Sequence, residues 1–222
     1  GNRDFYAICG NGSFMQIKLA ADGRVEKRQR SEKLFDAVND FLSIAASRIG
    51  DTWYFVSRQY NVYAIRMDGD TIELVNKWSL VTEAERDDNW TIAGLDHTAA
   101  HEASNRLFVL MHQGEAHQFE EPGTEVWVYD ATTGEKQQEI VLEEMSLAMK
   151  VSQTETPRLY TLNIHIPMPT LFVAWIFMTE GEAEVAKSVR QRMSAYDAAS
   201  GEHLFFSELI PTGGLVLYVQ PW

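Results

Sequence analysis

The most informative part of the sequence is residues 99–135, AAHEASNRLFVLMHQGEAHQFEEPGTEVWVYDATTGE. Its segments Leu107–Met111 and Glu125–Tyr129 are short and rich in β-branched and aromatic residues, which predicts two strands. A polar loop closed by Pro122–Gly123 separates them. A turn is predicted at Asp130–Gly134, because Asp bonds its own downstream backbone and Gly accepts a positive φ. The stretch therefore predicts an antiparallel hairpin that runs into a further strand.

The same unit recurs along the chain: an alternating apolar strand, an Asp/Gly turn and a polar strand. The segments YDATTGE and YDAASGE, which end at Glu135 and Glu202, are nearly identical. The turn glycines at 23, 69, 134 and 201 are spaced by 46, 65 and 67 residues. The first spacing fits the roughly 40–50 residues of a β-propeller blade, and the longer two require inserted loops. Further strands are predicted at Phe5–Cys9, Phe14–Leu19, Trp53–Ser57, Asn61–Arg66, Leu159–Leu162 and Met193–Tyr196.

Hairpins of this kind cannot bury both of their faces alone, so they are expected to stack on one another as blades. Residues 1–222 are therefore expected to form a single all-β domain, a partial β-propeller of antiparallel four-stranded blades. Blade-like units are expected near residues 1–35, 50–80, 95–145 and 150–222, with residues 163–192 as an insertion.

Three segments carry helical signals. Lys33–Ala46 has the amphipathic spacing of a helical turn or two, and Thr82–Arg86 predicts a short helix capped by Thr82. Glu180–Met193 has the composition most favourable to a helix, and we expect it to lie between strands as part of the insertion.

Composition excludes several classes of function. The 222 residues are 45% hydrophobic, which is enough for a substantial core. Lys and Arg number 19 against 32 Asp and Glu, a formal net charge of −13. Such a surface repels nucleic-acid phosphates and anionic lipid, so we expect neither as a partner.

No membrane-spanning or targeting segment is expected. The longest apolar run, Ile164–Met178, has 15 residues and contains His165, Pro167 and Pro169. A transmembrane helix needs about 20 apolar residues. The first four residues, GNRD, are polar, so no signal peptide is expected there.

Histidines offer the only metal-ligand pattern. His97 and His101 lie four residues apart, but that spacing places two ligands on one face only in a helix, and this segment reads as a strand entry or loop. Hydrogen-bonding loop residues are favoured over a zinc site for these two and for Glu102, His112, Glu115, His117 and Glu120. A Ser nucleophile elbow, a Walker motif and a dinucleotide motif are absent from the sequence. We therefore predict no catalytic, cofactor-binding or metal-binding residue.

Segments in five places resemble the heavy chain of the quinoprotein amine dehydrogenases, the methylamine and aromatic amine dehydrogenases. The matches keep the order and spacing of that family over roughly residues 5–162. They are FYAICGNGSF at 5–14, DTWYFVSRQYNVYAIRM at 51–67, LVTEAERDDNW at 80–90, the opening stretch at 99–135, and VSQ with LYTL within 151–162.

This resemblance implies the C-terminal portion of a seven-bladed propeller, about four blades of it, with other blades preceding. It implies a periplasmic heterotetramer of two heavy and two light chains that oxidises a primary amine to an aldehyde and ammonia. The tryptophan tryptophylquinone cofactor would lie in the light chain, and electrons would pass to a cupredoxin such as amicyanin or azurin. The heavy chain would be the non-catalytic subunit, and this chain alone would be inactive.

The chain departs from the family pattern at several points. In the family, the counterpart of Cys9 is bonded to an upstream cysteine. Cys9 is the only cysteine in this chain and is expected to be a free thiol. Residues 163–192 intervene where the family has almost none, and residues 211–222 lack its usual ending.

The chain is not expected to be the light subunit, which is small and dense in disulfides. Trp53 and Trp127, two of its six tryptophans, are expected to fill the core instead. Two alternatives remain open at this point. One is a propeller that only binds other proteins, and the other is a truncated remnant of the heavy chain with unpaired blade edges.

Overall fold

In the computed structural model the chain divides into two compact units, residues 1–80 and residues 81–222, and each is described by itself. The structure describes residues 3–40, 42–57, 59–69, 71–92, 98–113, 124–142, 155–165, 170–179, 189–206 and 210–212.

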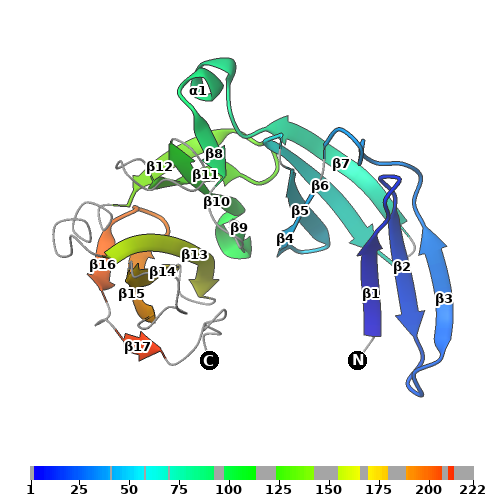
Figure 1. Ribbon diagram of the computed structural model, residues 1–222. Coiled ribbons are helices and arrows are strands. Elements are labelled where there is room, and N and C mark those ends of the chain that lie inside the picture. The colour runs from blue at the N-terminus through cyan, green and yellow to red at the C-terminus, as the bar shows by residue number, and fades with distance from the viewer. Residues whose placement is uncertain are drawn as a thin grey trace. The chain divides into compact units, whose positions relative to one another are not determined.

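The first unit consists of two antiparallel sheets whose strands follow one another along the chain (Figure 1). The first sheet has the order β1-β2-β3, with strands at Arg3–Ile8, Phe14–Leu19 and Val25–Arg30. The second has the order β4-β5-β6-β7, with strands at Leu42–Ile49, Thr52–Ser57, Asn61–Asp68 and Thr71–Ser79.

Glycine turns close the outer hairpins of both sheets. Gly23 lies between β2 and β3 with φ 84°, and Gly69 lies between β6 and β7 with φ 53°. A positive φ is the conformation for which glycine is required, and it lets the hairpin follow the twist of its strands. The turns predicted at these two glycines are therefore confirmed.

An aromatic core holds the two sheets of the first unit together. Phe14 of β2 is fully buried, and its ring lies 5.0 Å from that of Phe55 on β5 and 5.8 Å from that of Phe35. Tyr63 and Ile65 of β6 complete the centre of this cluster. Trp53, which was expected to fill the core, is partly buried and packs against the cluster. Each fully buried side chain of this size contributes about 1.5–3 kcal/mol through removal of apolar surface from water.

The second unit begins with helix α1, Glu83–Asp87, and contains two more antiparallel sheets. In the third sheet β10 pairs with both β8 and β9, so the edge strand next to β10 is in two pieces. Its elements are β8 Trp90–Ile92, β9 Thr98–His101, the 3-10 turn Glu102–Ser104, β10 Arg106–Gln113, β11 Thr124–Asp130 and β12 Lys136–Val141. In the fourth sheet β17 pairs with β15. Its strands are β13 Glu155–His165, β14 Thr170–Thr179, β15 Val189–Asp197, β16 His203–Phe206 and β17 Ile210–Thr212.

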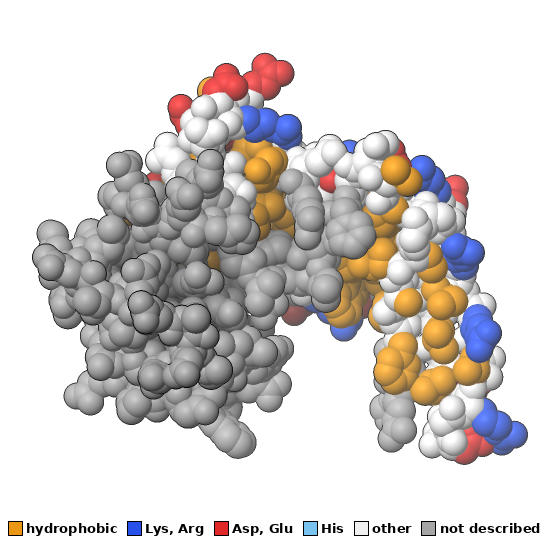
Figure 2. Space-filling view, in the orientation of Figure 1, with side chains coloured by type: hydrophobic (Ala, Val, Ile, Leu, Met, Phe, Trp, Pro, Cys, Tyr) orange, Lys and Arg blue, Asp and Glu red, His pale blue; other side chains and the backbone are white. Residues whose placement is uncertain are grey.

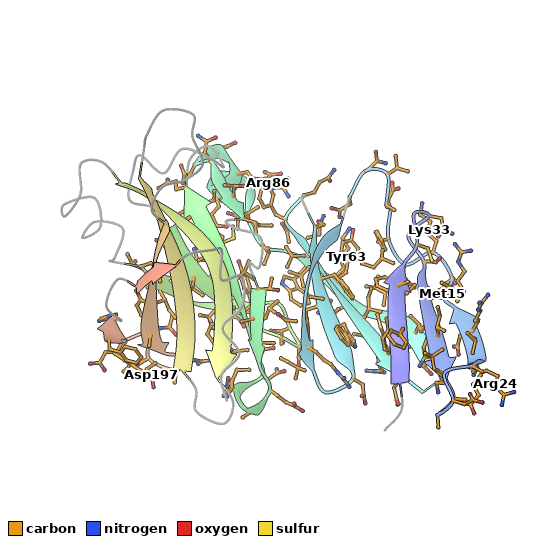
Figure 3. All side chains as sticks on the ribbon, turned by 60° about the horizontal axis from the view of Figure 1, so that its bottom comes forward. Met15, Arg24, Lys33, Tyr63, Arg86 and Asp197 are labelled. Carbon is orange, nitrogen blue, oxygen red and sulfur yellow. The ribbon has the colours of Figure 1, made fainter. Side chains whose placement is uncertain are left out.

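The internal repeat found in the sequence is a repeat in structure. Oδ1 of Asp130 accepts hydrogen bonds from the backbone N–H of Thr132 and Thr133 at 2.9 and 2.7 Å. Oδ1 of Asp197, at the end of β15 (Figure 3), accepts in the same way from the backbone N–H of Ala199 and Ser200, at 2.9 and 2.7 Å. Gly134 and Gly201 follow with φ of 77° and 76°. The prediction that Asp begins these turns and Gly ends them is confirmed.

These turns predict a pH-dependent contribution to stability. Hydrogen bonds from Thr133 hold the pKa of Asp130 below its ordinary value, so its contribution is present above pH 4 and is lost as the pH falls through the folded-state pKa. Asp130→Ala is expected to lower the free energy of unfolding by about 1 kcal/mol at pH 7. Urea denaturation of both proteins between pH 7 and pH 3 measures the difference between their free energies of unfolding, which should become smaller as the pH falls. A difference that does not change with pH would contradict this role of the Asp130 carboxylate.

Two helical predictions are wrong, the second of them in part. Asp36 accepts hydrogen bonds from the Val38 N–H at 3.3 Å and from Asn39 at 2.6 Å, and these local bonds compete with a helix over Lys33–Ala46. From Leu42 onward that segment is strand β4, paired with β5.

The helix predicted over Glu180–Met193 is wrong for its last five residues. Residues 189–193 belong to β15, and residues 180–188 lie outside the described residues. Pairing with β14 along the whole of β15 outweighs helix propensity, which is a weak preference. Residues 170–179, within the segment expected to be an insertion, form β14 between β13 and β15.

The short helix predicted after Thr82 is confirmed as α1. Among the described residues no helix is long and apolar enough to cross a membrane.

Candidate functional site

Charged and aromatic side chains of the second unit gather where α1 approaches β12. The helix is fixed by a capping box: Oγ1 of Thr82 accepts from the Glu85 N–H at 3.3 Å, and the Thr82 N–H donates to Oε2 of Glu85 at 2.7 Å. This reciprocal pair satisfies two backbone donors at the helix start. Glu85 is thereby held in one position, with its other oxygen free to bind elsewhere.

That other oxygen accepts a hydrogen bond from Nζ of Lys136, the first residue of β12. Nζ also donates to Oε1 of Glu139 at 2.6 Å. A register shift between Val128 and Tyr129 of β11 allows Lys136 and Glu139 to meet. It places Lys136 opposite Tyr129, and Glu139 opposite Trp127, so that all four side chains share one face of the sheet.

Trp127 forms the floor of the cluster. Nζ of Lys136 lies 3.8 Å from the centroid of its ring, a cation–π contact. The Trp127 indole donates from Nε1 to Oε2 of Glu125 at 2.7 Å, and its ring lies 5.0 Å from that of Trp90. Trp127 is 1% exposed, which confirms the prediction that it fills the core.

The electrostatics keep this cluster ionised at neutral pH. Burial would raise the pKa of Glu85, but hydrogen bonds from Lys136 and Thr82 outweigh it, and the pKa is lowered. Burial would likewise lower the pKa of Lys136, but Glu139 and Glu85 outweigh it, and the pKa is raised. Burial, and then the charges of the two glutamates, raises the pKa of Tyr129. The pKa shifts of Glu85 and Lys136 therefore favour the charged form of each.

A second polar cluster lies in the first unit around Asp40, which is 5% exposed. Its Oδ2 accepts from the Tyr63 hydroxyl at 2.5 Å and from Nδ2 of Asn61 at 2.7 Å. Its Oδ1 is buried and has no hydrogen-bond partner among the residues that the structure describes. Burial and then Asp40 raise the pKa of Tyr63, which is labelled on β6 in Figure 3. These bonds tie the segment before β4 to the start of β6.

Neither cluster was predicted from the sequence. Lys136 and Glu139 lie three apart on a strand, where alternation alone would put them on opposite faces. Only the register shift brings them together, and no motif in the sequence marks it. Asp40 lies in a segment whose apolar residues are spaced as in a helix. That pattern gives no indication that Asp40 is a buried hydrogen-bond acceptor.

The histidine pattern yields no metal site in the part of the chain that the structure describes. His101 ends β9, and its Nδ1 lies 2.7 Å from Oγ of Ser104 in the following 3-10 turn, a local contact. His97, Glu115, His117 and Glu120 lie outside the described residues, as does the side chain of His112. Cys9 follows β1, is partly exposed, and is a free thiol within this chain.

The exposed surfaces differ in chemistry. Hydrophobic side chains lie over β1 and β2 with Lys and Arg along the β3 side (Figure 2). Phe5 is 55% and Val25 is 47% exposed on this sheet. The acidic side chains of α1 form the red group at the top of the same view. The described residues thus offer binding surfaces and structural ion pairs.

Comparison with known proteins gives a consistent result. A family model described as methylamine dehydrogenase heavy chain (MADH) matches residues 1–193. The chain is 26% identical over 170 residues to the methylamine dehydrogenase heavy chain of Methylophilus methylotrophus, covering 73% of this chain and 40% of that one. It is 26% identical over 206 residues to that of Paracoccus versutus, covering 90% and 41%. The chain spans about two fifths of the length of these relatives.

Solved structures agree on the fold. The Dos1 propeller aligns with a TM-score of 0.51 over 94% of this chain and 44% of its own, at 11% identity. An identity that low shows the fold alone. The prediction of an all-β propeller of antiparallel blades is confirmed.

Proposed function

Because the chain belongs to the methylamine dehydrogenase heavy chain family, we propose that it acts as the heavy subunit of an amine dehydrogenase. The observation that carries the proposal is the family match over residues 1–193. The β-propeller fold supports it, since a propeller presents rigid loops and faces on which a partner can be held.

The proposed enzyme divides its work between two kinds of chain. A light chain would carry tryptophan tryptophylquinone and oxidise a primary amine to an aldehyde and ammonia. This chain would hold the light chain and present a surface to the electron acceptor, a cupredoxin such as amicyanin or azurin. The assembly would be a periplasmic heterotetramer of two heavy and two light chains.

Two of the six tryptophans, Trp90 and Trp127, support assigning the cofactor to the partner. Trp127 is buried, donates its indole N–H to Glu125 and carries Lys136 on its face. Its contact with Trp90, at 5.0 Å between ring centroids and 50° between planes, is an ordinary tilted aromatic pair. Both rings are committed to packing, so this chain's contribution is to bind and to orient.

A second candidate function is a propeller that binds other proteins without an enzyme attached. The exposed Phe5 and Val25 of the first sheet favour it, because exposed apolar side chains that lie together are typical of protein-binding surfaces. Both candidates share the fold, and they differ in whether a quinone-bearing light chain binds.

Co-expression with a light chain of the family separates the two. This chain would carry an affinity tag, and the purified product would be analysed for protein composition and for a visible quinone absorption band. The expected result is that the light chain elutes with this chain and brings the quinone band with it. The light chain expressed without this chain is the control for adhesion to the resin. A colourless product that contains this chain alone would overturn the proposal and favour the binding module or remnant.

A further inference from the structure

The ammonium group of Lys136 is enclosed by three side chains, Glu85, Glu139 and Trp127, which we name the ammonium cage. Two carboxylates accept hydrogen bonds from Nζ, and the indole face lies 3.8 Å from it. The Lys136 side chain is 26% exposed and that of Glu85 is 21% exposed, so the contacts are partly shielded from water. Carboxylates that take N–H donors, together with an aromatic face for the charge, are the means by which proteins bind alkylammonium ions.

Two walls of the ammonium cage are held in place without help from Lys136. The capping box with Thr82 fixes Glu85. Burial, the hydrogen bond to Glu125 and the contact with Trp90 fix the Trp127 ring. A site whose walls are already ordered loses little entropy when a ligand enters it. The cage should therefore persist when the lysine is shortened.

The charge of the ammonium cage favours a cation. Glu85 and Glu139 bring two negative charges to one ammonium, and both raise the pKa of the neighbouring Tyr129. Glu125 lies behind the indole as the acceptor of its N–H. Without Lys136 the site would hold two carboxylates beside the aromatic face of Trp127, an arrangement that attracts a replacement cation.

We propose that the ammonium cage is a binding site for primary alkylammonium ions, which the chain fills with its own Lys136. In the intact chain the tethered ammonium fastens the α1 segment to the third sheet. Free ammonium ions compete poorly with it, because tethering gives the lysine an effective concentration on the order of millimolar or more. Shortening the side chain opens the site to ligands from solution. This inference does not depend on the proposed enzyme function.

The test uses Lys136→Ala and n-propylammonium, which replaces the atoms that the substitution removes. The melting temperature and the tryptophan fluorescence of the variant are measured against ligand concentration at constant ionic strength, with sodium as the balancing ion. Both are expected to change saturably with a dissociation constant of roughly 1–100 mM, as befits a ligand of four heavy atoms. Tetramethylammonium, which has the charge but no N–H donor, is expected to act at least tenfold more weakly.

Two variants serve as controls. Lys136→Ala combined with Glu85→Gln removes one wall's charge and should abolish the saturable response. Lys77→Ala removes an ammonium that lies 4.8 Å from the centroid of the Tyr63 ring. Among the ion pairs of the described residues, none joins Lys77 to two carboxylates, so Lys77→Ala should show no saturable response to n-propylammonium.

The proposal is overturned if n-propylammonium and sodium act alike on Lys136→Ala, or if Lys77→Ala responds equally. If Lys136→Ala is too unstable to purify folded, its refolding yield from urea becomes the readout. A yield that rises with n-propylammonium and not with tetramethylammonium supports the site, and equal yields overturn it.

Discussion

Gly12→Ala is expected to destabilise the first unit by about 2–5 kcal/mol, because its backbone is enclosed by the segment before β4. A Cβ at this position would lie 1.9 Å from the carbonyl oxygen of Phe35, and the residue has φ +84°. The Gly12 carbonyl also accepts from the N–H of Leu34 at 2.8 Å, so the two segments cannot separate without losing that bond. The cost combines left-handed strain, about 1–2 kcal/mol, with a forced backbone shift, about 1–3 kcal/mol. Urea denaturation followed by far-UV circular dichroism measures it.

Gly23→Ala is the matched control. It has the same φ of +84°, but a Cβ there would meet nothing within 4 Å. Only the left-handed strain remains, and the stiffer unfolded chain offsets part of it, so the expected loss is about 1 kcal/mol. Equal losses for the two variants would show that the close approach between Gly12 and Phe35 is not present in the folded protein.

Phe14→Ala is expected to cost about 3–5 kcal/mol of unfolding free energy, as removal of a fully buried phenyl group does. Phe14 is 0% exposed. Its ring contacts Phe55 on β5 and Phe35 in the segment between β3 and β4. Its loss leaves a cavity between the two sheets of the first unit. The same urea denaturation measures the effect.

Phe5→Ala serves as the matched control on the neighbouring strand. Phe5 pairs with Ile17 of β2, whereas Phe14 pairs with Ile8 of β1, and alternation puts Phe5 and Phe14 on opposite faces of the first sheet. Because Phe5 is 55% exposed, Phe5→Ala should lower the free energy of unfolding by less than about 1 kcal/mol. A loss as large as that of Phe14→Ala would mean that the apolar face of β1 is covered in the folded protein.

Turn chemistry was the most reliable guide in the sequence. Asp130 and Gly134, and their repeats at 197 and 201, act through local bonds and a local φ, so the residues themselves specify the hairpins. The capped helix after Thr82 was predictable for the same reason, since both partners of its capping box lie within four residues.

What the sequence did not reveal depends on contacts distant along the chain. Residues 189–193 favour a helix by composition but pair with β14, and sheet pairing overrides propensity. Asp40 is bonded by Tyr63, 23 residues away. Lys136 meets Glu85, 51 residues away, only because of a register shift in the sheet. No local pattern carries such information.

Native mass spectrometry of the co-expressed proteins would show whether this chain is a heavy-chain propeller that holds a light chain. We expect a species in which this 25.3 kDa chain and the light chain are present in equal numbers. If the spectrum contains only the two separate proteins, this chain does not hold the light chain.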